Sequence, residues 1–190
     1  MKLGIYVGSF NPVHKGHIAI VNHLIDNNYI DKVLIIPTGN YWGKNNLINI
    51  KHRINMLEFY ESDNIIVDKD HNDIQYTYEL LNILKKIYKD DTLYLIIGAD
   101  NITNLDRWKN YEEILKHQII VINRDNIDIN SYINNLGKKN NFHVINSLPQ
   151  NNISSSAVRN LIKDNKINYL DKYIDKEIIN YILKNKLYDV

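Results

Sequence analysis

The chain has 190 residues, of which 44% are hydrophobic and 24% are charged, and these proportions fit one globular domain over residues 1–190. It contains no cysteine, which excludes disulfides, thiolate nucleophiles and cysteine-held zinc or iron–sulfur sites. Lys and Arg total 23 against 22 Asp and Glu, a net charge of +1, so no overall field attracts nucleic acid or a membrane. The first residues lack the long apolar stretch of a signal peptide, and no run approaches membrane-spanning length; we therefore expect a cytoplasmic protein.

Short apolar runs alternate with helix-length segments along most of the chain. We predict strands at residues 3–7, 32–37, 64–67, 92–97, 118–122 and 142–145. Helices are predicted at 16–27, 50–61, 77–88, 111–116 and 129–135, and a C-terminal helical segment of about 154–190 has helices at 154–163, 169–174 and 176–184. Self-association through these C-terminal helices, or their packing on the sheet, is left open.

The alternation predicts an α/β fold, namely a Rossmann-like open parallel sheet with helices on both faces. Several strands are nearly continuous in Ile, Leu and Val, as in parallel strands that are covered on both sides. Such a sheet binds ligands outside the carboxyl ends of its strands. The residues that directly follow each strand are therefore the candidates for chemistry.

The first predicted strand runs directly into a polar turn. Gly8 allows a sharp turn and a close approach of another group, and Ser9 and Asn11 supply polar side chains. Pro12 fixes the loop before the helix. The first-turn amides of the following helix form a ready anion site.

Two histidines stand at the start of that helix. His14 and His17 are three residues apart and can share one helix face, with Gly16 between them leaving room for a bulky ligand. Two imidazoles beside helix amides suit a phosphate that gains charge during a reaction. A single histidine here would more often be a cap or a solvated residue, and a zinc site lacks an evident third ligand nearby. We therefore predict phosphate chemistry.

Residues 8–17 read Gly-Ser-Phe-Asn-Pro-Val-His-Lys-Gly-His, which resembles the nucleotidyltransferase signature Gly-[Ser/Thr]-Phe-[Asp/Asn]-Pro-x-His-x-Gly-His. Residues 153–159 read Ile-Ser-Ser-Ser-Ala-Val-Arg, similar to the second signature, Ile-Ser-Ser-Thr-x-Ile-Arg. The segments between them resemble one branch of that superfamily, the nicotinate (or nicotinamide) mononucleotide adenylyltransferases. The resemblance covers the whole chain and implies adenylyl transfer from ATP to a pyridine mononucleotide.

The second motif places three serines where a helix begins, and Arg159 follows one turn later. Taken alone, this is a serine-capped helix with a solvated arginine. The resemblance implies that the motif holds the triphosphate of ATP, with Arg159 near the departing pyrophosphate, where its planar donors can grip phosphate oxygens. The ATP-binding residues that it implies are Gly8, Ser9, Phe10, His17, Gly98, Asp100, Ile153, Ser154, Ser155 and Arg159. The catalytic residues that it implies are His14, His17, Lys44 and Arg159.

Two middle segments bear on the substrate. Gly98 and Asp100 end a predicted strand, and the family's Gly-x-Asp segment contacts nucleotide ribose; the alternative is that Asp100 caps the next helix. Trp108 is either a core anchor or a residue that stacks on the pyridine ring, as a tryptophan at this place does in the family. The substrate-binding residues so implied are Asn11, Lys44, Tyr76, Thr77, Trp108 and Lys109.

Three departures from the family pattern concern the pyridine end or the loop above the phosphates. Lys109 stands where an aromatic residue is often found, and Gln75 replaces a serine. The run Tyr41-Trp42-Gly43-Lys44 keeps only the final lysine of the family's Pro-Pro-His-Lys loop. The choice between nicotinate and nicotinamide mononucleotide is therefore left open.

We predict an enzyme of NAD biosynthesis in which the phosphate of nicotinate mononucleotide attacks ATP, giving nicotinate adenine dinucleotide and pyrophosphate; nicotinamide mononucleotide is the alternative acceptor. Mg²⁺ is expected to bridge the ATP phosphates, with no protein metal ligand assigned. Phosphopantetheine as the acceptor is a rival within the enzymes that share both motifs, as is cytidylyl transfer. A nucleotide-binding regulator without catalysis is the rival outside enzymes. Pyrophosphate release separates the regulator from the enzymes, and competition between acceptors separates the enzymes from one another.

Overall fold

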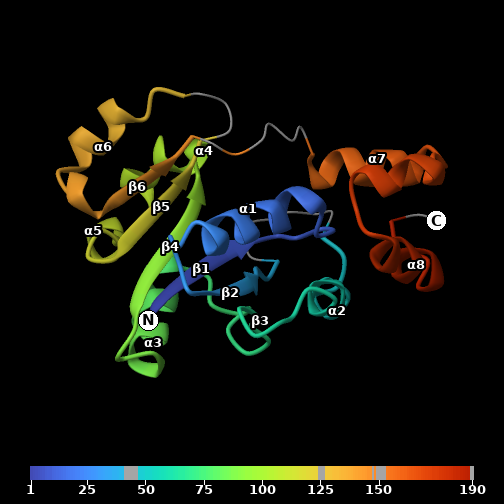
Figure 1. Cartoon of the computed structure of the whole chain (residues 1–190), viewed down its shortest axis with the longest axis horizontal. Coiled ribbons are helices and arrows are strands. Elements are labelled where there is room, and N and C mark those ends of the chain that lie inside the picture. The colour runs from blue at the N-terminus through green and yellow to red at the C-terminus, as the bar shows by residue number, and fades with distance from the viewer. Residues whose placement is uncertain (41–46, 124–126, 147, 149–152, 189–190) are drawn as a thin grey trace.

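A sheet of six parallel strands forms the centre of the molecule in the computed structural model (Figure 1). The structure describes residues 1–40, 47–123, 127–146, 148 and 153–188. The strands are β1 (Lys2–Gly8), β2 (Lys32–Pro37), β3 (Ile65–Val67), β4 (Thr92–Gly98), β5 (Gln118–Ile122) and β6 (Phe142–Ile145). Every strand pairing is parallel.

The strand order is β3-β2-β1-β4-β5-β6. The chain therefore builds one half of the sheet outward from β1 and then returns to build the other half from β4. Neighbouring loops leave β1 and β4 in opposite directions at such a switch point, and this opens a crevice at the carboxyl edge. The pairing of Tyr6 with Ile96 brings the ends of β1 and β4 together there.

Helices cover both faces of the sheet. Within the described residues they are α1 (Lys15–Asp26), α2 (Ile50–Glu58), α3 (Thr77–Ile87), α4 (Ala99–Ile102), α5 (Tyr111–Ile114), α6 (Asn130–Leu136), α7 (Ser155–Lys163) and α8 (Lys176–Lys184), with 3-10 helices at Leu105–Arg107, Lys139–Asn141 and Ile167–Lys172. Figure 1 shows α1 lying across the sheet, with α7 and α8 together at the end toward which β1 runs.

Two hydrophobic clusters, one on each face, explain why the strands read as continuous apolar runs. Val33 and Ile35 of β2 belong to the cluster under α1, α2, α7 and α8, whereas Leu34 and Ile36 belong to the cluster under α3, α4, α5 and α6. Alternate side chains point to opposite faces of a strand, so covering both faces requires apolar residues at every position. Burial of each such Leu or Ile side chain stabilises the folded state by roughly 1.5–3 kcal/mol relative to leaving it exposed.

The C-terminal helices pack on the rest of the chain. Ile178 and Ile182 of α8 are fully buried in the cluster that contains α1 and α2. The Tyr181 hydroxyl bonds to Nδ1 of His52 at 2.9 Å and accepts from the amide of Asn55 at 2.8 Å, and both partners lie on α2. Of the two alternatives left open for this segment, the described residues show packing.

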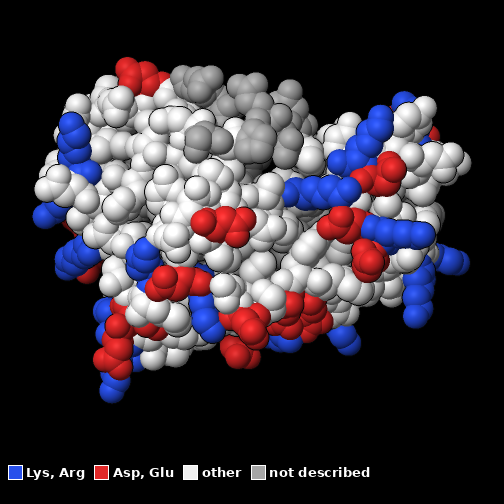
Figure 2. Space-filling model, viewed as in Figure 1, with Lys and Arg blue, Asp and Glu red and all other residues white. Residues whose placement is uncertain are grey.

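The predicted fold class is confirmed, and all six strands lie where the sequence predicted them, to within one residue at either end. The predicted helix over 169–174 is instead a 3-10 helix at Ile167–Lys172, and α4 and two further 3-10 helices were not predicted. None of the helices in the described ranges is long and apolar enough to cross a bilayer. Figure 2 shows basic and acidic side chains interspersed over one face, in keeping with the nearly balanced charge.

Candidate active site

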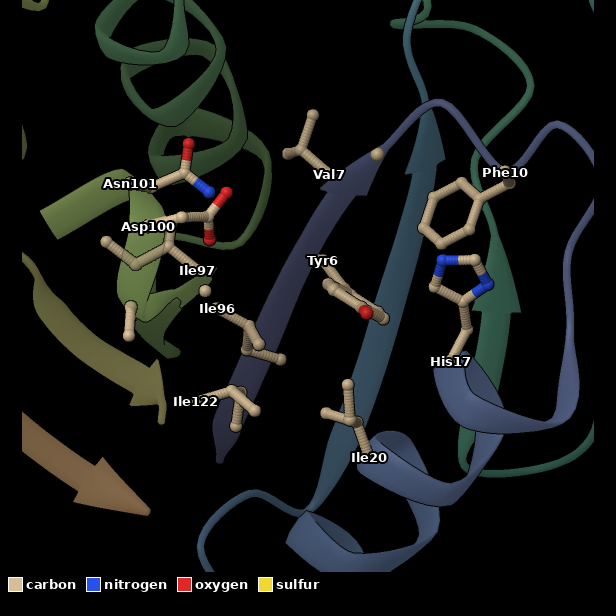
Figure 3. A pocket seen from close by; sticks show the side chains of 13 residues that line it. Tyr6, Val7, Phe10, His17, Ile20, Ile96, Ile97, Asp100, Asn101 and Ile122 are labelled. Carbon is tan, nitrogen blue, oxygen red and sulfur yellow. The ribbon is translucent and has the colours of Figure 1, made fainter. Parts of the chain in front are cut away.

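A cavity of 380 Å³ opens at the switch point between β1 and β4. Its floor is apolar, with Tyr6 on β1, Ile20 on α1 and Ile96 on β4. Figure 3 shows His17 of α1 on one side of this space and Asp100 of α4 on the other, so an imidazole and a carboxylate face it from two different helices. A planar ring with polar groups at its edge fits such walls.

Phe10 closes one wall of this cavity. Its ring meets those of Tyr6 and His17 edge-on, with centroids 5.4 Å and 5.0 Å apart. Its backbone has a φ of 45°, a left-handed conformation that is unfavourable for a bulky residue and that clusters at functional sites. A Cβ atom on Gly8 would lie 3.0 Å from Cζ of Phe10, a tight contact, so glycine at position 8 leaves room for the ring to fold back over the strand end.

The two histidines of the motif are stacked at the start of α1. Their ring centroids are 3.6 Å apart and their planes are inclined by 20°. The backbone N–H of His14 donates to Nδ1 of His17 at 3.2 Å. Because Nδ1 accepts, the neutral His17 ring carries its proton on Nε2, where it is a hydrogen-bond donor. His17 lines the cavity, whereas His14 is only 3% exposed.

Gly16 has a different role from the one expected of it. A Cβ atom there would lie 3.1 Å from two atoms of the His14 ring and 3.6 Å from Cβ of Ile153. The space beside Gly16 is thus filled by protein groups, and the expectation that it leaves room for a bulky ligand is wrong. Its missing side chain lets the His14 ring and the second motif come close to the helix.

The second motif docks directly on the first. The Ser155 hydroxyl donates to the carbonyl oxygen of Pro12 at 2.8 Å, and Nη1 of Arg159 donates to the carbonyl oxygen of Asn11 at 2.7 Å. Nη2 of Arg159 also donates to the Ser156 hydroxyl at 3.1 Å. Ser154 caps α7, because its hydroxyl accepts from the backbone N–H three residues later at 3.1 Å. The N-terminus of α7 is thereby fixed beside that of α1.

Gly98 and Asp100 lie together at the end of β4 and both line the cavity. A Cβ atom on Gly98 would overlap Oδ1 of Asp100, so the carboxylate folds back over the glycine. The N-cap of α4 is Gly98, and Asp100 stands in the first turn. The alternative reading of Asp100 as the cap of this helix is therefore wrong, and its carboxylate faces the cavity (Figure 3).

A second cavity, of 450 Å³, lies between the start of α3 and the segment before α5. Its lining contains Gln75, Tyr76, Thr77, Arg107, Trp108, Lys109 and Ile114. Nζ of Lys109 stands 4.1 Å from the centroid of the Tyr76 ring, a favourable cation–π distance. The fold thus joins the two segments that the sequence assigned to the pyridine end.

The model of the cytidylyltransferase-like family matches residues 5–161. A protein of Acholeplasma laidlawii, named a probable nicotinate-nucleotide adenylyltransferase, is 35% identical over 97% of this chain and 96% of its own. The chain belongs to the nicotinate-nucleotide adenylyltransferase family. A protein of the same name from Fusobacterium nucleatum is also 35% identical, over 95% of this chain and all of its own.

A solved member of the nicotinate-nucleotide adenylyltransferase family has the same fold. The nicotinic acid mononucleotide adenylyltransferase of Plasmodium falciparum, solved in complex with NaAD, is 29% identical and superposes with a TM-score of 0.83. The alignment covers 99% of this chain and 97% of the other. The family resemblance carried by the two sequence motifs is confirmed.

The structure groups most of the residues predicted from family membership. Gly8, Phe10, His17, Gly98 and Asp100 line the first cavity, and Tyr76, Thr77, Trp108 and Lys109 line the second. His14, Asn11, Ser155 and Arg159 lie where the two motifs meet. Lys44 lies outside the described residues, as does the rest of its loop at 41–46.

Sequence reasoning missed Arg53, Arg107 and Tyr188. Arg107 lines the second cavity. It directly precedes Trp108 in the sequence, and this position was the signal that could have identified it. Arg53 is 1% exposed, and Nη1 of its guanidinium donates to the Ser9 carbonyl at 2.8 Å. An arginine on a short polar helix reads as a solvated residue, and nothing local marks it as buried.

Proposed function

We propose that this protein transfers the adenylyl group of ATP to nicotinate mononucleotide, giving nicotinate adenine dinucleotide and pyrophosphate. The observation that carries the proposal is the pair of cavities. One is lined by Gly8, Phe10 and His17 of the first nucleotidyltransferase motif, and the other has an aromatic and cationic lining around Trp108. A dinucleotide needs two such places, one for each base, with the phosphates between them. The Plasmodium falciparum relative was solved with NaAD bound, which is the product of this reaction.

In the proposed reaction, a phosphate oxygen of the mononucleotide attacks the α-phosphorus of ATP in line. The bond from that phosphorus to the bridging oxygen of the β-phosphate breaks, and pyrophosphate leaves with the electron pair. The protein forms no covalent bond, so its work is to position the reactants and to stabilise charge on the phosphoryl oxygens. The chain has no cysteine, and this route requires no protein nucleophile.

His17 is the donor that we assign to the α-phosphate. Its Nε2–H is set by the bond that Nδ1 accepts from the His14 backbone, and a donor fixed before the reaction stabilises developing charge without reorganisation. The His14 ring lies 3.6 Å from the His17 ring, and we assign it a supporting electrostatic role beside His17. Arg159 and Ser155 approach the phosphates from the second motif, and Lys44 is proposed to do so from its loop.

Mg²⁺ enters as part of the substrate, bridging the phosphates of ATP. Within the parts of the chain that the structure describes, no group of three or more His, Asp or Glu residues is arranged to hold a metal. Mg²⁺ keeps several waters and is bound through substrate phosphates more often than in an all-protein cage. When bound, the ion would neutralise charge on the phosphates. His17 and Arg159 orient those phosphates.

The second cavity favours a negatively charged acceptor. Arg107 and Lys109 are among its lining residues, and the described lining contains no carboxylate. Trp108 and Tyr76 offer flat surfaces for a pyridine ring. The carboxylate of nicotinate would meet two cations here, whereas the neutral amide of nicotinamide would not gain this attraction.

Mg²⁺-dependent pyrophosphate release from ATP tests the proposal, with nicotinate mononucleotide, nicotinamide mononucleotide and phosphopantetheine compared as acceptors. We expect release with the nicotinate form at a higher kcat/KM than with the others. Faster release with phosphopantetheine would reassign the acceptor, and no release with any of them would favour a nucleotide-binding regulator. We also propose that residues 1–190 act as one domain, because α8 shares a hydrophobic cluster with α1.

A further inference from the structure

A buried polar group supports the first motif from inside the protein. Arg53 of α2 is 1% exposed. Nη1 of its guanidinium donates to the Ser9 carbonyl at 2.8 Å, and its Nε donates to the Ile48 carbonyl at 3.2 Å. One side chain therefore holds two segments, the turn after β1 and the residues that lead into α2.

Asn11 connects this group to the C-terminus. Its side-chain Oδ1 accepts from the Tyr188 hydroxyl at 3.0 Å and from the Ile48 backbone N–H at 3.4 Å. Its backbone carbonyl accepts from Arg159 at 2.7 Å. Asn11 is only 2% exposed, so its side chain faces these partners, and the residue that sequence reasoning assigned to substrate lies at the centre of a supporting network.

The pKa values of Arg53 and Tyr188 are shifted in the direction that burial favours. Burial lowers the pKa of Arg53 and is the largest influence on it. Burial raises the pKa of Tyr188, while Arg159 and Arg53 act in the opposite direction. The Tyr188 hydroxyl therefore stays protonated near neutral pH and remains a donor to Asn11. Placing an arginine and a tyrosine hydroxyl in the interior is costly unless hydrogen bonds satisfy them.

We propose that Arg53 and Tyr188 are positioning residues for adenylyl transfer, a role that rests on the function proposed above. Through Ser9 and Asn11 they fix the turn that carries Phe10 and, by way of the carbonyl of Asn11, the guanidinium of Arg159. Neither touches the reacting atoms. Reaction rates depend steeply on such placement, since a displacement of about 1 Å can cost about 10²-fold, and supporting groups keep catalytic side chains within about 0.5 Å.

The chain supplies a matched control for a merely structural role. Tyr181 lies on α8, and its hydroxyl also bonds across to α2, to His52 and Asn55. Both of these partners lie on α2, outside the first motif. Tyr188→Phe and Tyr181→Phe each remove one hydroxyl group by which the C-terminal segment is hydrogen-bonded to the rest of the chain. Only the first removes a bond to Asn11.

The experiment measures kcat, KM for ATP, KM for nicotinate mononucleotide and the melting temperature of the wild type and both variants. We expect Tyr188→Phe to lower kcat about tenfold, within the loss that misplacement of a reacting group produces, with little change in KM for the mononucleotide. Tyr181→Phe keeps the kcat of the wild type, although it lowers the melting temperature by a similar amount.

Arg53→Lys provides a second, independent variant. It keeps a positive charge but cannot reach two carbonyls in the fixed geometry of a guanidinium, so we expect kcat to fall while the protein stays folded. A wild-type kcat in Tyr188→Phe, or an equal loss of kcat in Tyr181→Phe, would overturn this inference alone. If the wild type released no pyrophosphate with any acceptor, the proposed function would fall as well.

Discussion

The hydroxyl of Ser155 donates a 2.8 Å hydrogen bond to the carbonyl oxygen of Pro12, across 143 residues of sequence. Arg159 makes a parallel connection to Asn11. Because each motif satisfies polar groups of the other, the N-termini of α1 and α7 are held side by side. Two helix N-termini that share one region favour a ligand with several negative charges.

Replacing His17 tests the donor assigned to the α-phosphate. We expect His17→Ala to lower kcat on the order of 10²–10³-fold, as the loss of one charge-stabilising donor does, while ATP binding is retained. Single-turnover kinetics and ATP titration measure the two effects separately. His23→Ala is the control, since His23 lies on the same helix and its side chain contacts Asn27 and Tyr29. Near wild-type turnover in His17→Ala would show that the role is wrong.

Gly98→Ala tests the placement of Asp100. The added Cβ atom would overlap Oδ1 of Asp100, so we expect the carboxylate to turn away and KM for ATP to rise, with little loss of stability because a side-chain end can move. Gly137→Ala is the contrasting variant, because φ is 73° and no atom lies within 4 Å of the new Cβ. It should cost about 0.5–1 kcal/mol or more of stability and leave KM unchanged. An unaltered KM in Gly98→Ala would count against a ribose contact by Asp100.

Lys109→Gln tests the charge in the second cavity. With one of two cations removed, we expect the ratio of kcat/KM for nicotinate over nicotinamide mononucleotide to fall, because attraction to the carboxylate weakens. Raising the salt concentration should reduce the same ratio in the wild type. Lys116→Gln is the control, since Lys116 is exposed and pairs with Glu113 at 2.7 Å. A ratio unchanged by Lys109→Gln would mean that other groups read the carboxylate.

Acid should destabilise the fold through two histidines. Burial lowers the pKa of His143, and burial followed by Lys85 lowers the pKa of His117, from an ordinary value of 6.5. Below that value the unfolded state binds more protons than the folded state. The contribution of these two histidines to the free energy of unfolding is therefore fully present above pH 6.5 and is lost as the pH falls through their folded pKa values. We expect the melting temperature of the wild type to fall as the pH is lowered through this range, and that of His143→Gln to fall less steeply. Parallel curves would contradict the assignment.

The strands and both motifs follow from the sequence for physical reasons. Runs such as residues 32–37 are apolar at successive positions because both faces of a central parallel strand are covered. The glycines and histidines of the first motif stand in fixed spacing at the start of a helix, so residues 8–17 can be recognised in one dimension. Their order along the chain, combined with strand order, places them at one edge.

Only the tertiary structure decided which of these residues reach the cavity and which hold them in place. His17 lines it while His14 is stacked beneath and almost fully buried, although the sequence treats the two alike. The roles of Arg53 and Tyr188 depend on contacts across 44 and 177 residues. Local propensity and spacing carry no information about such contacts, because burial of a polar group is set by what the rest of the chain folds around it.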